Sequence, residues 1–126
     1  MLTCADLKQY SMSCPPDYPL CRSARIQEKY DTFISNPENK KKFIEKITKM
    51  VNSSTYYFTE NNFPYHTVRG IEHWVCWYKR DHDVDFIIDC LKEQYDIVTY
   101  WKNLPNNRSI QEINHLHVFI DISGLK

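Results

Sequence analysis

The sequence predicts a single α+β domain, and three observations lead to that fold class. Two segments with helical spacing come first, and a strand–strand–helix–strand–strand order follows them. The strand segments are rich in β-branched and aromatic residues, which favour extended backbone. The 126 residues include only two glycines but nine tyrosines, six phenylalanines and three tryptophans, a composition typical of a compact, ordered core.

The first 22 residues differ from the rest of the chain. Pro15, Pro16 and Pro19 make this segment rich in turns, so we expect residues 1–22 to form an extended arm laid over the domain. Residues 23–126 then make up the single domain.

The helical part of the domain covers residues 23–53. Ser23 can cap a helix that runs to about Ser35, and Asn36 followed by Pro37 restarts a second helix. The apolar residues of both helices recur every three or four positions: Ile26, Tyr30, Phe33, Ile34, Phe43, Ile44, Ile47 and Met50. The lysines that surround the second set are interpreted as a solvated helix face rather than a nucleic-acid patch.

The core of the domain is predicted over residues 54–122. Its strands are expected at residues 55–59, 71–79, 97–101 and 111–120. Between the second and third strands, apolar spacing predicts an amphipathic helix over residues 83–95, capped by Asp83.

Composition excludes several classes of partner. Lys plus Arg and Asp plus Glu both number 16, so no global field attracts nucleic acid or a membrane. No apolar run approaches the roughly 20 residues needed to span a bilayer, and the first residues do not resemble a signal peptide. We therefore expect a cytoplasmic protein. Abundant Lys and Asn with scarce Gly suggest an AT-rich viral or protist genome, in which case a viral chain would act in the host cytoplasm.

Five cysteines are expected to be reduced thiols. Cys76 and Cys90 lie in apolar segments, where a free thiol acts as a small hydrophobic group. Cys14 and Cys21 could pair, or share a zinc ion with Cys4, but their spacing matches no standard zinc pattern. No metal or cofactor is expected.

The last strand carries the candidate chemistry. Because successive side chains of a strand point to opposite faces, this strand has two different faces. One is aliphatic and suits a core: Leu116, Val118, Ile120 and Ile122. The other is ionisable and should line either a solvent-facing surface or a pocket: His115, His117, Phe119 and Asp121. Two imidazoles at this spacing lie roughly 6–7 Å apart, close enough to touch one phosphate or one metal ion. They could equally be two ordinary half-exposed histidines.

Residues 55–122 resemble the histidine triad (HIT) superfamily of nucleotide hydrolases and transferases. Gln111, His115 and His117 follow the order and spacing of the family's last strand. Asn103 stands where the family has an asparagine that meets the nucleotide, and Ser109 lies in the polar loop before the strand. The resemblance implies an antiparallel sheet with helices packed on it, here preceded by the arm and two helices.

The strand around His73 is also similar to a family strand, but two positions depart from the pattern. Phe119 replaces the third histidine of the triad, and Tyr78 replaces a common proline. The family's nucleophile is the middle histidine, which corresponds to His117. The loss at Phe119 leaves that nucleophile in place and favours a catalytically silent module.

From about residue 20 onward, the chain resembles a second family, uncharacterised fungal proteins described as N-acetylglucosamine-induced. The matching segments include residues 62–65, 70–77 and 108–119. That family is similar to a divergent histidine triad fold, so the two resemblances imply the same architecture.

The resemblance implies a nucleotide-phosphate hydrolase or transferase that forms a nucleotidyl-histidine at His117. His115 would assist it, Gln111 and Ser109 would stabilise charge on phosphate oxygens, and Asn103 would hold ribose or phosphate. His73 is open between a substrate-binding and a core role.

Further expectations concern stacking residues, alternative functions and partners. Aromatic side chains could stack on a base, namely Phe63, Tyr65 or Trp74. The alternative function is a silent HIT-like binding or interaction module; a third, metal-dependent hydrolysis, would use His115, His117 and Asp121. The expected partner is a nucleotide or another small phosphate ligand. The family commonly forms homodimers, although the first 50 residues could cover that surface instead.

Overall fold

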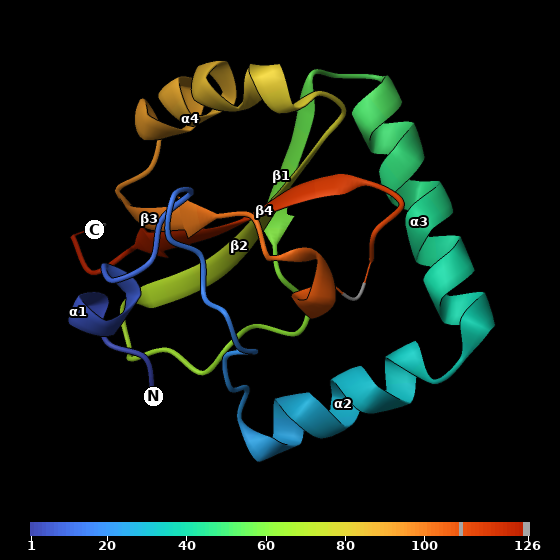
Figure 1. Ribbon diagram of the computed structural model, residues 1–126, viewed down its shortest axis with the longest axis horizontal. Helices are drawn as coiled ribbons and strands as arrows, with labels where there is room; N and C mark the ends of the chain where they lie inside the picture. Colours follow the sequence, from blue (N-terminus) through green and yellow to red (C-terminus); the bar gives the residue numbers. More distant parts are fainter. Residues whose placement is uncertain (109, 125–126) are drawn as a thin grey trace.

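The computed structural model describes residues 1–108 and 110–124, and it has the predicted α+β fold (Figure 1). Its four strands form one antiparallel sheet in the order β1-β2-β4-β3. The strands are β1 (Tyr56–Glu60), β2 (Ile71–Tyr78), β3 (Ile97–Trp101) and β4 (Asn114–Asp121). The two longest strands, β2 and β4, lie at the centre of the sheet, so the predicted histidine strand is an inner strand.

The helices over the predicted segments lie close to their expected bounds, and one further short helix lies within the segment predicted as an extended arm. The helices are α1 (Cys4–Leu7), α2 (Ala24–Ile34), α3 (Pro37–Asn52) and α4 (Val84–Lys92), with short 3₁₀ turns at Asp81–Asp83 and Pro105–Asn107. Ser23 caps α2 as predicted, and Asn36 caps α3 with Pro37 in its first turn. The predicted cap at Asp83 is wrong, because its carboxylate accepts from Arg80 Nε at 3.2 Å and makes no capping bond.

The face of the sheet beneath α4 is an aliphatic and aromatic core. Leu116, Val118 and Ile120 of β4 meet Ile87, Ile88 and Leu91 of α4 there, and all six are essentially inaccessible. Burial of such side chains stabilises a fold by about 1.5–3 kcal/mol each. The predicted aliphatic row of β4 is confirmed.

The opposite face is covered by two separate groups. At one end, Ile47 and Val51 of α3 pack on Val75 and Trp77 of β2. At the other end, Leu7 and Leu20 of the N-terminal segment pack with Ile71, Trp101 and Phe119. In Figure 1, α3 and α2 lie on the side of the sheet away from α4. The histidines lie between the two groups.

The N-terminal segment is more structured than an extended arm. Thr3 forms a capping box with Asp6 and starts α1, which places Leu7 in the core. Leu2 forms a parallel bridge with Thr67, and Thr99 Oγ1 donates to the Tyr10 carbonyl at 2.6 Å. Residues 1–22 therefore complete one end of the histidine face.

All five cysteines are free thiols, so Cys14 and Cys21 do not pair. Burial raises the pKa of the Cys76 thiol to about 12. Over the described ranges, the helices are too short and too polar to cross a bilayer.

Candidate functional site

A cavity of about 440 Å³ lies over the histidine face of the sheet. Its floor comes from β1, β2 and β4, and α2, α3 and the loop after β3 form its walls. Of the predicted site residues, His115, His117 and Asn103 line it. The prediction of a pocket is therefore confirmed, and that of a solvent-facing or half-exposed histidine surface is wrong, since His115 and His117 are only 9% and 5% exposed.

The pairing of β2 with β4 brings His73 to His117. His73 pairs with Phe119 and Val75 with His117, which places the two imidazoles on the same face of adjacent strands. His73 Nε2 and His117 Nδ1 are 2.7 Å apart. His73 does not line the cavity; it is a buried partner of His117, and its ring stacks against Tyr65 and Phe119.

The backbone fixes the tautomer of His73. Tyr65 N–H donates to His73 Nδ1 at 3.0 Å, so that nitrogen carries a lone pair. A neutral His73 then has its proton on Nε2 and donates it to His117 Nδ1. It follows that neutral His117 carries its own proton on Nε2.

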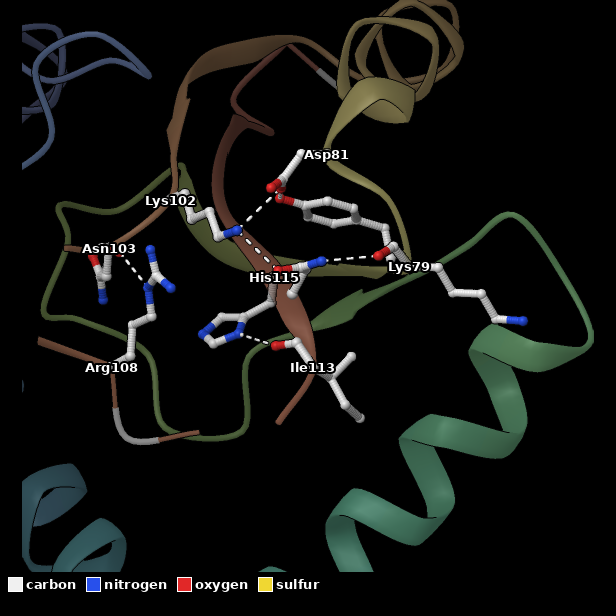
Figure 2. A network of polar contacts seen from close by, with 9 residues as sticks. Lys79, Asp81, Lys102, Asn103, Arg108, Ile113 and His115 are labelled. Carbon is white, nitrogen blue, oxygen red and sulfur yellow. Dashed lines mark hydrogen bonds and ion pairs between the residues drawn. The ribbon is translucent and has the colours of Figure 1, made fainter. Parts of the chain in front are cut away.

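His115 has the opposite tautomer. Its Nδ1 lies 3.2 Å from the Ile113 carbonyl, which can only accept, so Nδ1 carries the proton and Nε2 the lone pair. Figure 2 shows the ring with Nδ1 turned to Ile113 and the other nitrogen turned to the side on which Arg108 lies. The His115 and His117 ring centres are 5.5 Å apart.

Asn103 follows β3 and is held on two sides. Its Oδ1 accepts from Trp101 Nε1 at 2.9 Å, and its Nδ2 lies 3.4 Å from the Asn107 carbonyl. Its backbone carbonyl accepts from Arg108 Nε at 2.5 Å (Figure 2). Asn103 Nδ2 also lies 2.9 Å from His117 Nε2. This loop therefore fixes an amide against the central histidine.

The three histidines of this face stay neutral near neutral pH. Burial lowers the pKa of His73 and of His117 well below 6.5, and nearby His115 and Arg22 act in the same direction. Burial also lowers the pKa of His115, with Arg108 and Lys102 contributing. No carboxylate contributes to these shifts, so the wall presents neutral imidazoles to a ligand.

The charge around the cavity is mainly positive. Arg22, Lys46 and Arg108 line it against one carboxylate, Glu60. The Arg22 guanidinium lies 4.2 Å from the centre of the Tyr30 ring, and its Nε donates to the Phe63 carbonyl at 2.7 Å. The aromatic side chains that line the cavity are Tyr30, Phe33, Phe43, Tyr57, Phe63, Tyr65 and Trp77. Basic and flat apolar surfaces thus border one space.

Other predicted residues lie elsewhere. Gln111 is exposed, does not line the cavity, and donates from Nε2 to the Pro105 carbonyl at 3.3 Å. Ser109 lies outside the described residues. Trp74 faces the α4 side and stacks on Phe58, so the prediction that it stacks on a bound base is wrong. Phe63 and Tyr65 do line the cavity.

The metal alternative has no support from the geometry. Asp121, at the end of β4, accepts from Ser123 and does not border the cavity. Throughout residues 1–108 and 110–124, no group of three His, Cys, Asp or Glu side chains could hold a metal ion.

Sequence reasoning missed Arg22, Lys46 and Arg108 as cavity residues. Two of them could have been found from their neighbours in the sequence. Arg22 directly precedes the residue that caps α2, and Arg108 stands in the same polar loop as Asn103. Lys46 belongs to the lysines that the sequence predicts as a solvated helix face, and it also borders the cavity. The sequence alone does not show which side of α3 meets the sheet.

Comparison with known proteins supports the fold. No family model matches the chain, and no curated protein matches it. Among solved structures, the chain is similar to the crystal structure of HTC1, with 17% sequence identity and a TM-score of 0.60 over 81% of this chain and 76% of that one. At this identity the likeness concerns the fold alone.

Proposed function

We propose that this protein binds a nucleotide or another small phosphate compound in the cavity over the histidine face. The observation that carries the proposal is one cavity bordered by both basic and aromatic side chains, with His115, His117 and Asn103 on its wall. A phosphate needs N–H donors and positive charge, and a base needs flat apolar surface. This cavity offers both.

The size of the cavity agrees with that ligand class. Small-molecule sites commonly measure about 300–1,000 Å³ and are mostly apolar with a few convergent polar groups. The present cavity, at about 440 Å³, has room for a mononucleotide-sized ligand. The resemblance of residues 103–117 to the histidine triad family supports the same class.

Turnover is the second candidate function, favoured by His117 and Asn103 lying together on the cavity wall. In that mechanism a His117 lone pair attacks phosphorus, the bond to the leaving group breaks, and water then hydrolyses the nucleotidyl-histidine. His117 Nδ1 faces His73, however, and Nε2 carries the proton in the tautomer set by Tyr65. Attack would require both histidines to change tautomer, so binding without turnover is better supported.

The first test is ligand binding by purified protein. Thermal melting is measured with AMP, GMP, CMP, UMP and inorganic phosphate, for the wild type and for His117→Asn. His82→Asn is the matched control, since His82 is 72% exposed at its side chain. We expect at least one nucleotide to raise Tm for the wild type and the control, and to raise it less for His117→Asn.

The second test separates binding from turnover. Hydrolysis of a nucleoside phosphoramidate and of a dinucleoside polyphosphate is followed for the same three proteins. Turnover that His117→Asn abolishes would establish the enzyme; stabilisation without turnover would establish a binding module. If no phosphate compound raises Tm, the proposed function is wrong.

We further propose a cytoplasmic location, or the host cytoplasm for a viral chain, supported by the five free thiols. Homodimerisation through a sheet edge also stays a proposal. The edges are β1 and β3, and light scattering on the purified chain would decide.

A further inference from the structure

Five groups form a continuous line of polar contacts along the cavity wall. They are Tyr65 N–H, His73, His117, Asn103 and Trp101 Nε1–H. Successive contacts measure 3.0, 2.7, 2.9 and 2.9 Å. Both ends of the line are N–H groups, which can only donate.

A line with a donor at each end cannot be satisfied by neutral side chains. From one end, Tyr65 N–H fixes a lone pair on His73 Nδ1, so His73 donates to His117 and leaves the His117 proton on Nε2. From the other end, Trp101 Nε1–H fixes Asn103 Oδ1 as an acceptor, which turns the Asn103 amide nitrogen toward His117. Two N–H donors therefore face each other at this contact.

The orientation of Asn103 has a second support. Its Nδ2 lies near the Asn107 carbonyl, an acceptor that would repel an amide oxygen in that place. Reversing the amide would also bring Nδ2 against Trp101 Nε1–H, which is completely buried. The excess donor is therefore located between His117 and Asn103, two residues that border the cavity.

We propose that His117 Nε2–H and Asn103 Nδ2–H together form an oxyanion subsite that holds a phosphate oxygen of the ligand. One oxygen with several lone pairs can accept from both donors, whereas the group that faces His117 Nε2 is the Asn103 amide nitrogen, itself a donor. Both side chains are more than nine-tenths buried, so these donors have little other access to water.

The surroundings of the pair agree with an anion. Arg108 lines the same cavity and is fixed by the Asn103 carbonyl. Trp77 also lines the cavity, and its Nε1–H is a buried donor without an acceptor in the described part of the chain. The wall thus has an excess of donors and a nearby positive charge. This inference rests on the proposed function and specifies which atoms meet the phosphate.

The decisive measurement uses the wild-type protein without ligand. Long-range ¹H–¹⁵N correlation spectra report which ring nitrogen of each histidine carries the proton. We expect His117 and His73 to be protonated on Nε2 and His115 on Nδ1. A His117 protonated on Nδ1 would overturn the subsite, because its Nε2 would then accept from Asn103. This result does not depend on ligand binding.

Titration with inorganic phosphate and AMP then locates the anion. We expect the His117 Nε2 proton signal to shift on binding. Asn103→Asp should weaken binding by more than about tenfold, since it replaces a donor with a carboxylate. Asn106→Asp is the matched control, because this exposed residue of the same loop also borders the cavity; we expect it to weaken binding by less than about threefold.

The outcomes separate the two proposals. Binding with no shift at His117, or with equal losses in both variants, would overturn the oxyanion subsite and leave the proposed function intact. Absence of any phosphate-dependent shift in the cavity would overturn both. The expected tautomers, the shift and the unequal losses together would establish the subsite.

Discussion

The two faces of the central sheet share the same strands but have different chemistry. Beneath α4, the side chains of β4 are aliphatic and almost completely buried. On the other face, the intervening side chains are His115 and His117, and a cavity lies above them. These β4 side chains are largely buried on both faces, and the second face alone has histidines among them. The difference shows how one strand can supply a rigid support and a binding wall through alternation alone.

Among substitutions, the largest loss of stability should come from the face of the sheet beneath α4. Leu116→Ala removes a completely buried side chain, and the surrounding α4 core cannot close around the gap, so we expect a loss of about 3 kcal/mol in the free energy of unfolding. His115→Leu, one residue away, keeps the volume and should cost only about 1 kcal/mol. Urea denaturation measures both. Equal losses would contradict the distinction between the faces.

Among changes of condition rather than of sequence, pH acting on the histidine face should have an effect of comparable size. The pKa values of His73 and His117 are well below 6.5 in the folded protein, so the unfolded chain binds more protons as pH falls below that value. Stability should therefore be greatest above pH 6.5 and decrease below it. The slope approaches about 1.4 kcal/mol per pH unit for each of the two histidines.

Urea denaturation between pH 7.5 and 5 measures this slope. Carboxylates with lowered pKa values, such as Asp81, act in the same direction but at more acidic pH, because their unfolded values lie near 3.8. A free energy of unfolding that stays constant down to pH 5 would show that the buried histidines become protonated in the folded state.

The difference between the two faces of the sheet could be predicted from the sequence only where it depends on residues close together in the chain. The alternation along β4 is local, and it correctly separated His115 and His117 from Leu116 and Val118. The caps at Ser23 and Asn36 are also local, and they were predicted correctly. The fold class followed from these short-range patterns.

What the sequence could not predict depends on register and packing. The His73–His117 contact requires a particular pairing of β2 with β4, and the same pairing places Trp74 opposite Val118 on the α4 side. The burial of the histidines requires α3 and Leu7 to cover that face. Contacts between residues far apart in sequence are not visible in periodicity.

His73→Leu should affect the polar face itself. The substitution removes the acceptor for Tyr65 N–H and the donor to His117 Nδ1, leaving two buried polar groups without partners. We expect a loss of about 2 kcal/mol in the free energy of unfolding and weaker nucleotide binding. His66→Leu, an exposed histidine of the preceding loop, should change stability by less than about 0.5 kcal/mol.

Chemical denaturation of the two variants provides the comparison. If His73→Leu were as stable as His66→Leu, the line of contacts from Tyr65 to His117 would contribute nothing to the folded state. In that case the histidine face would resemble the α4 face, where only packing matters.

The smallest effect should come from a residue that acts on the cavity at a distance. Ser23 Oγ accepts from Ile26 N–H at the start of α2, a helix that supplies Tyr30 and Phe33 to the cavity wall. Ser23→Ala should cost about 1 kcal/mol and fray the first turn of α2. Ser35→Ala, at the other end of the same helix, removes only a bond from Oγ to the Thr32 carbonyl and should cost less.

Thermal melting with and without AMP measures both variants. A larger ligand-dependent loss for Ser23→Ala than for Ser35→Ala would show that the order of α2 contributes to binding, and equal losses would restrict the binding wall to the sheet and the loop at Asn103.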